Sequence, residues 1–90
     1  MKGNAWTLRT VQIALKICER PDYYTENDLA ESFFTSNTSI RREIGLLKQN
    51  GIGAYSIKRK YRIIANDKTR EWLQSIQDQF LLLDALIHQF

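Results

Sequence analysis

The sequence predicts a mainly α-helical domain with a small β-hairpin, followed by an amphipathic C-terminal helix. Apolar residues recur at steps of three and four before residue 50 and again after residue 66, which places them on one face of a helix. Between these segments, residues 52–64 hold two short runs rich in β-branched and aromatic residues, which is typical of strands. At 90 residues, the chain is long enough for one domain with a modest core.

A first helix is expected over residues 7–20. Thr7 is a residue type that caps helix N-termini, and Pro21 disfavours helical backbone at the residue before it. A second helix is expected from Thr25, because Thr25 and Asp28 form a capping-box pattern. Each helix has an apolar face, made in the first by Leu8, Val11, Leu15 and Cys18 and in the second by Leu29, Ala30 and Phe33.

A third helix is expected over residues 37–49, with Ser36 as its N-cap. Asn50 and Gly51 supply the left-handed residue that commonly ends a helix. The spacing of three apolar residues predicts its inner face, formed by Ile40, Ile44 and Leu47. The hairpin follows, with strands at residues 54–57 and 61–64 and a basic tip at 58–60. It lacks an Asn-Gly turn, so its register stays open.

A last helix is expected from Asn66 or Asp67 to the chain end. Its apolar residues form a seam nearly three heptads long, and Trp72 widens the apolar arc beside it. A helix apolar over so wide an arc has more than one surface to bury, so we expect one surface to meet the domain core and another to meet a second copy of the chain. The predicted dimerisation residues are Trp72, Leu73, Ile76, Phe80, Leu83, Ile87 and Phe90. Alternatively, this helix leads into a further domain.

The positive charge is concentrated in the middle of the chain. Residues 37–64 hold seven Lys or Arg and one Glu, a net charge of +6, whereas residues 1–36 have a net charge of −1 and residues 65–90 of −2. This asymmetry favours a polyanionic partner over a merely solvated basic face.

Three helices, a short hairpin and a basic segment are the parts of a winged helix-turn-helix. In that arrangement the second helix braces the third, the third enters the DNA major groove, and the hairpin touches the neighbouring backbone. The sequence therefore predicts a DNA-binding domain at residues 1–65 and a dimerisation helix at residues 66–90.

A local pattern resembles winged-helix bacterial regulators, namely DeoR-type repressors, the DNA-binding domain of the biotin repressor, and the N-terminal domains of WYL-type regulators. The residues that carry it are Leu29-Ala30, Phe33, Ser36, Ser39-Ile40, Arg42-Glu43-Ile44, Leu47 and Gly51. The chain departs from the pattern at Thr35, where an apolar residue is usual, and at Lys60, where glycine is frequent. The ligand-sensing domain of the larger relatives has no counterpart after the hairpin, so no small-molecule effector is implied.

Groove chemistry assigns roles to the basic segment. Arg is the side chain best shaped for a bidentate contact with guanine, which makes Arg41 or Arg42 the candidate base reader. The hairpin cations would contact phosphates. Purely structural roles compete with DNA contact at two positions, because Arg42 can pair with an acid and Thr25 can serve only as a cap. The predicted DNA-contacting residues are Thr25, Ser36, Asn37, Thr38, Ser39, Arg41, Arg42, Lys48, Lys58, Arg59 and Lys60.

We therefore expect a sequence-specific regulator of transcription that binds double-stranded DNA as a homodimer, with repression as the default action. The alternatives are a winged helix that binds a protein partner and an architectural protein that binds DNA without sequence preference.

Catalysis has almost no support in the sequence. No Cys/His pair stands at nucleophile or zinc spacing, no glycine loop suits a phosphate, and His88 is the only histidine. We expect no enzymatic activity, no metal and no cofactor. The sequence also predicts no membrane span, and the single Cys18 agrees with a reducing compartment, so we expect a cytoplasmic protein of a bacterium or phage, associated with the nucleoid.

Overall fold

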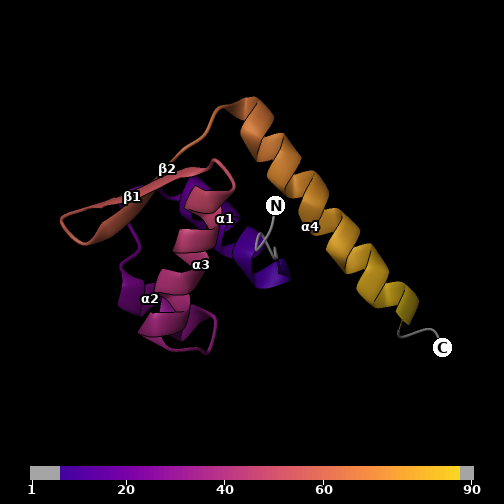
Figure 1. The fold of residues 1–90 in the computed structure, drawn as a ribbon, viewed down its shortest axis with the longest axis horizontal. Coiled ribbons are helices and arrows are strands. Elements are labelled where there is room, and N and C mark those ends of the chain that lie inside the picture. Colours follow the sequence, from indigo (N-terminus) through magenta and orange to yellow (C-terminus); the bar gives the residue numbers. More distant parts are fainter. Residues whose placement is uncertain (1–6, 88–90) are drawn as a thin grey trace.

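The computed structural model describes residues 7–87 and confirms a mainly α-helical fold with a hairpin and a long C-terminal helix (Figure 1). Helices α1, α2 and α3 cluster together, the hairpin β1–β2 lies along one side of them, and α4 extends away as an arm (Figure 1). Three helices followed by a two-stranded antiparallel hairpin are consistent with a winged-helix topology. The bounds are α1 Leu8–Glu19, α2 Glu26–Ser32, α3 Asn37–Gln49, β1 Gly53–Ile57, β2 Lys60–Ile64 and α4 Asp67–Ile87.

Local capping explains where the first three helices begin. The side chains of Thr7, Thr25 and Ser36 each accept a hydrogen bond from the backbone N–H three residues further on. These bonds satisfy donors that the first turn of a helix leaves without a partner. At the other end of α3, Gly51 adopts a φ of 83°, the left-handed backbone expected after a helix. The predicted caps and the predicted bounds of α3 are confirmed.

The hairpin has a tighter tip than the sequence indicates. Gly53 lies opposite Ile64 and Ile57 lies opposite Lys60, so only Lys58 and Arg59 form the turn. Both turn residues have a left-handed backbone, with φ of 52° and 72°, as a two-residue turn compatible with the strand twist requires. Lys60, which the sequence placed in the tip, is the first residue of β2.

The hairpin is tied to the loop between α1 and α2. The Tyr61 backbone N–H donates to the Tyr24 carbonyl at 2.9 Å, and the Asp22 N–H donates to the Tyr61 carbonyl at 2.9 Å. These bonds extend the pairing of β2 by one further segment and hold the hairpin against the start of α2.

The core lies between α1, α3 and the hairpin, and α4 contributes to it through its first half. Ile40, Ile44 and Leu47 are buried, which confirms the predicted inner face of α3. Leu73 of α4 is fully buried among α1 side chains, with Ile76 and Phe80 packed beside it. Further buried residues are Val11, Ile13, Ala14, Ile17, Leu29, Ala30, Ile52, Ala54 and Ile63.

The packing of α4 corrects the predicted dimerisation seam at Leu73, and two further residues of that seam, Ile76 and Phe80, are partly buried against the same core. Leu73 belongs to the core of its own chain, because the apolar arc that faces α1 is centred on it. The second half of α4 is exposed, whereas Phe90 lies outside the described residues. Among residues 7–87, none of the helices combines the length and the apolar character that a membrane span needs.

One buried polar contact connects α1 to α3. Thr10 is fully buried and Glu43 is 9% exposed, and the Thr10 hydroxyl donates to Glu43 Oε1 at 2.5 Å. The same Thr10 oxygen accepts a hydrogen bond from the Thr7 backbone N–H at 3.2 Å, which completes the capping box of α1. Since a buried carboxylate without a partner is costly, this hydroxyl stabilises the orientation in which Glu43 faces α1.

We expect Thr10→Val to lower the free energy of unfolding by about 1–3 kcal/mol, because it leaves the buried Glu43 carboxylate without its donor. Urea denaturation measures this change. Thr10→Ser keeps the hydroxyl and should cost less, and Thr7→Ala reports the capping loss alone. Equal stability of the Val and Ser variants would contradict the importance assigned to this contact.

Candidate nucleic-acid interface

The outer face of α3 is built by the burial of its inner face. With Ile40 directed into the core, Thr38 and Arg42 lie on the opposite side, one turn apart, and both are exposed. Asn37 and Lys48 are also exposed, on the side of α3 nearer the hairpin. Ser39 is half-buried and accepts a hydrogen bond from the Ser36 hydroxyl at 3.1 Å, so both serines are engaged within the helix start.

Arg41 is held by a neighbouring acid. Its Nε lies 3.0 Å from Glu26 Oε2, at the start of α2, although its side chain is still 64% exposed. Tyr61 of β2 adjoins this pair: burial, the negative charge of Glu26 and a hydrogen bond to Glu26 raise the pKa of Tyr61. The phenol therefore stays protonated and donates to the carboxylate. Sequence reasoning missed Glu26 and Tyr61 as partners of Arg41, because they lie on other elements.

A polar groove of about 470 Å³ separates the helix pair from the hairpin. It brings together the starts of α2 and α3 with one flank of the β1–β2 hairpin, which is called the wing from here on. The predicted residues Thr25, Asn37 and Arg59 all border this groove. Its lining residues are Thr25, Glu26, Asn27, Asn37, Ser56, Arg59 and Tyr61.

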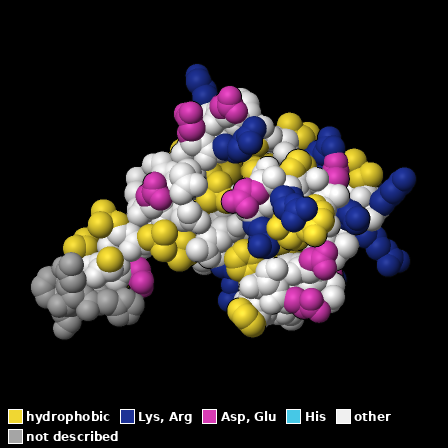
Figure 2. Space-filling view, turned by 180° about the vertical axis from the view of Figure 1, so that it is seen from behind, with side chains coloured by type: hydrophobic (Ala, Val, Ile, Leu, Met, Phe, Trp, Pro, Cys, Tyr) yellow, Lys and Arg dark blue, Asp and Glu magenta, His cyan; other side chains and the backbone are white. Residues whose placement is uncertain are grey.

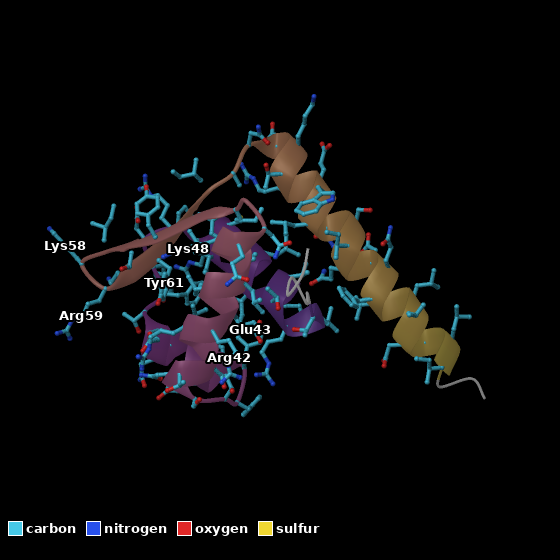
Figure 3. All side chains as sticks on the ribbon, viewed as in Figure 1. Arg42, Glu43, Lys48, Lys58, Arg59 and Tyr61 are labelled. Carbon is cyan, nitrogen blue, oxygen red and sulfur yellow. The ribbon has the colours of Figure 1, made fainter. Side chains whose placement is uncertain are left out.

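The wing tip presents two cations away from the body of the protein. Lys58 and Arg59 project from the end of the hairpin (Figure 3). Lys60, behind them, is exposed and lies beside Thr25, with which it forms an isolated bridge. Arg62 is engaged with Asp22 through two hydrogen bonds, which raise the pKa of the guanidinium.

The seven cations of residues 37–64 therefore divide into two groups. Arg41 and Arg62 are ion-paired. The other five are exposed and take part in no ion pair within residues 7–87: Arg42, Lys48, Lys58, Arg59 and Lys60. Seen from behind, Lys and Arg side chains gather at the hairpin end of the molecule, whereas hydrophobic side chains follow the arm (Figure 2). The positive charge that takes part in no ion pair among these residues thus lies on α3 and the wing, where Lys60 is also attracted by the carboxylate of Asp28.

Gly45 is a further feature of α3 that sequence reasoning missed. It lies in the middle of the helix, where glycine costs about 1 kcal/mol relative to alanine. A Cβ built at Gly45 would meet no atom within 4 Å, so packing within the chain does not require glycine. By helical spacing Gly45 faces outward between Arg42 and the exposed Gln49. The sequence does contain a signal for this site, because an isolated glycine inside a helical pattern often has a packing or functional reason.

Comparison of the chain with protein-family models, curated proteins and solved structures gives no match. The exposed cations of α3 and of the hairpin are therefore the features that indicate an interface.

Proposed function

We propose that this protein is a winged-helix regulator of transcription that binds double-stranded DNA in a sequence-specific manner. The observation that supports it is the division of the cations: five take part in no ion pair within residues 7–87, and they lie on α3 and on the wing, the two parts of a winged helix that meet DNA. The local resemblance to DeoR-type, biotin-repressor and WYL-type domains points to the same use. Bound at a promoter, such a protein represses by occupying the DNA.

The ion pairs refine the roles of the two arginines. Arg42 is exposed on the outermost face of α3 and takes part in no described ion pair, so we assign it the base contact. Arg41, held by Glu26 beside the polar groove, suits the phosphate backbone at the groove edge. Lys58 and Arg59 extend to the backbone on the far side of the wing.

Gly45 gives independent support for a ligand on this face. A helix-interior glycine that no internal contact requires is explained if another molecule approaches the backbone closely at that point. The major groove admits an α-helix along such a face. A protein partner could also approach α3 closely, but the exposed cations around Gly45 favour a polyanion.

We expect Arg42→Ala and Lys58→Ala to weaken DNA binding in different ways. Arg42→Ala should cost about 1–3 kcal/mol on the selected site and relax one base position. Lys58→Ala should weaken binding to all sequences alike and reduce the slope of log K against log salt by about 1. Selection from random duplexes, followed by binding at several salt concentrations, measures both.

The matched controls lie on α4, where Arg70→Ala and Lys68→Ala remove the same charges away from α3 and the wing. Selection that enriches no sequence, with binding that still depends on salt, would indicate an architectural protein. The absence of salt-dependent binding by the unmodified chain would overturn the proposal.

Gly45→Ala should change stability and DNA binding in opposite directions. The free energy of unfolding should rise by about 0.5–1 kcal/mol, because alanine is the better helix former and its methyl group meets open space. Affinity for the selected DNA should fall, because the methyl group keeps α3 further from the groove. Thermal unfolding and a binding titration test the two halves, and unchanged affinity would remove Gly45 from the interface.

The proposed regulator acts as a homodimer through the exposed part of α4. Leu83 is 59% exposed and Ile87 is 66% exposed, far from the core that covers Leu73. A two-fold dimer would present two α3 helices to an inverted repeat.

Leu83→Glu should shift the protein from dimer to monomer in sedimentation at tens of micromolar. Leu81→Glu is the matched control, because Leu81 is 45% exposed on the opposite side of α4. If the unmodified chain sediments as a monomer under these conditions, the dimer is excluded. DNA binding by single copies is tested separately by the binding titrations.

A further inference from the structure

An acidic side chain lines the polar groove beside the proposed DNA-binding surface. Glu26, the first residue of α2, borders this groove, and its side chain is 26% exposed. An acid at such a place repels the phosphates of DNA, so it opposes binding unless its charge has another use. It is not the capping acid of α2, because Asp28 accepts the hydrogen bond from the Thr25 backbone N–H. A charge in the first turn favours the helix dipole, but that role does not require the Glu26 carboxylate to reach α3, as it does here.

Three elements of the fold meet at the Glu26 carboxylate. On one side, its Oε2 lies 3.0 Å from Nε of Arg41 on α3. On the other, the phenol of Tyr61 on β2 donates a hydrogen bond to it. Glu26 and Tyr61 both line the groove. The carboxylate is therefore held between α3 and the wing, and the direction in which it holds the arginine depends on both.

The contact with Glu26 leaves donors of the Arg41 guanidinium for a second partner. A guanidinium carries five N–H donors, and one carboxylate accepts from two of them in the usual bidentate geometry. Because the Arg41 side chain is 64% exposed, the remaining donors are accessible to a ligand. Arg41 follows Asn37 by one helical turn, and Asn37 borders the groove, so both residues lie on the same side of α3. An arginine held in this way is already ordered before it meets a ligand, which reduces the entropy lost on binding.

We infer that Glu26 and Tyr61 are positioning residues, which hold Arg41 so that the free edge of its guanidinium meets a DNA phosphate beside the groove. This inference rests on the proposed function, in which Arg41 contacts the phosphate backbone. A guanidinium in a fixed orientation binds a phosphate through parallel hydrogen bonds. The inference has a consequence of unusual sign, because removal of a negative charge beside the DNA should weaken the binding of DNA.

A double-mutant cycle between Glu26 and Arg41 tests the inference through the sign of the change in affinity. Glu26→Gln should lower the affinity of the full chain for the selected duplex about 3- to 10-fold, because part of one charge-assisted contact is lost. In the Arg41→Ala background, the same substitution should raise the affinity, because Glu26 then only repels the phosphates. Tyr61→Phe changes no charge and should weaken binding when Arg41 is present but not in the Arg41→Ala background. Titrations of each variant with the duplex at one salt concentration measure these affinities.

The matched control is Glu31→Gln, which removes the same charge from an exposed position on α2. Glu31 takes part in no ion pair within residues 7–87, so this variant should not bind DNA more weakly than the unmodified chain. Circular dichroism of each variant confirms that it is folded. If Glu26→Gln does not fold, the cycle of Tyr61→Phe with Arg41→Ala takes its place.

Three results would overturn the inference while leaving the proposed function intact. A rise in affinity on Glu26→Gln in both backgrounds would show that Glu26 only repels DNA. An equal fall in both backgrounds would show that Glu26 acts without Arg41. Unchanged affinity in Glu26→Gln and in Tyr61→Phe would show that Arg41 does not need to be held. The absence of salt-dependent DNA binding by the unmodified chain would instead overturn the proposed function and this inference together.

Discussion

The hydrogen bond from Thr10 to Glu43 acts together with the buried Ile40 and Leu47 to hold one side of α3 against α1. Successive residues of a helix point in different directions around its axis, so the side of α3 that is buried determines which of its residues are exposed. Since Glu43 is held against α1, its neighbour Arg42 is turned by about 100° toward solvent. The same hydroxyl completes the cap of α1, so a single buried side chain connects the start of α1 to the inward side of α3.

Two ion pairs engage part of the positive charge of residues 37–64 within the fold. Glu26 connects α2 to α3 through Arg41, and Asp22 connects the loop after α1 to β2 through Arg62. Exposed pairs of this kind stabilise a fold only modestly, and they add to the backbone hydrogen bonds that already tie β2 to the loop before α2. The other five cations of residues 37–64 take part in no ion pair within the described residues, and the proposed function assigns DNA contacts to them.

Features that depend on neighbours in sequence were predictable, and features that depend on distant partners were not. The caps Thr7, Thr25 and Ser36 are local contacts, and the bounds of α3 follow from one of them. The pairing of Arg41 with Glu26 requires α2 to pack beside α3, and the spacing of residues within either helix does not predict this contact. The heptad pattern alone could not predict which side of α4 faces the core, because α4 is apolar on adjoining sides. Only its packing on α1 assigns Leu73 to the core.

The wing tip combines two positive charges with a backbone conformation that disfavours bulky residues. Lys58 and Arg59 both have the left-handed backbone that asparagine and glycine adopt most readily. Two bulky cations in that turn carry backbone strain on the order of 1–2 kcal/mol each. Replacing both with asparagine and glycine would relieve this strain and also remove two of the cations on which the proposed function depends, so thermostability and the proposed function place opposite demands on this turn.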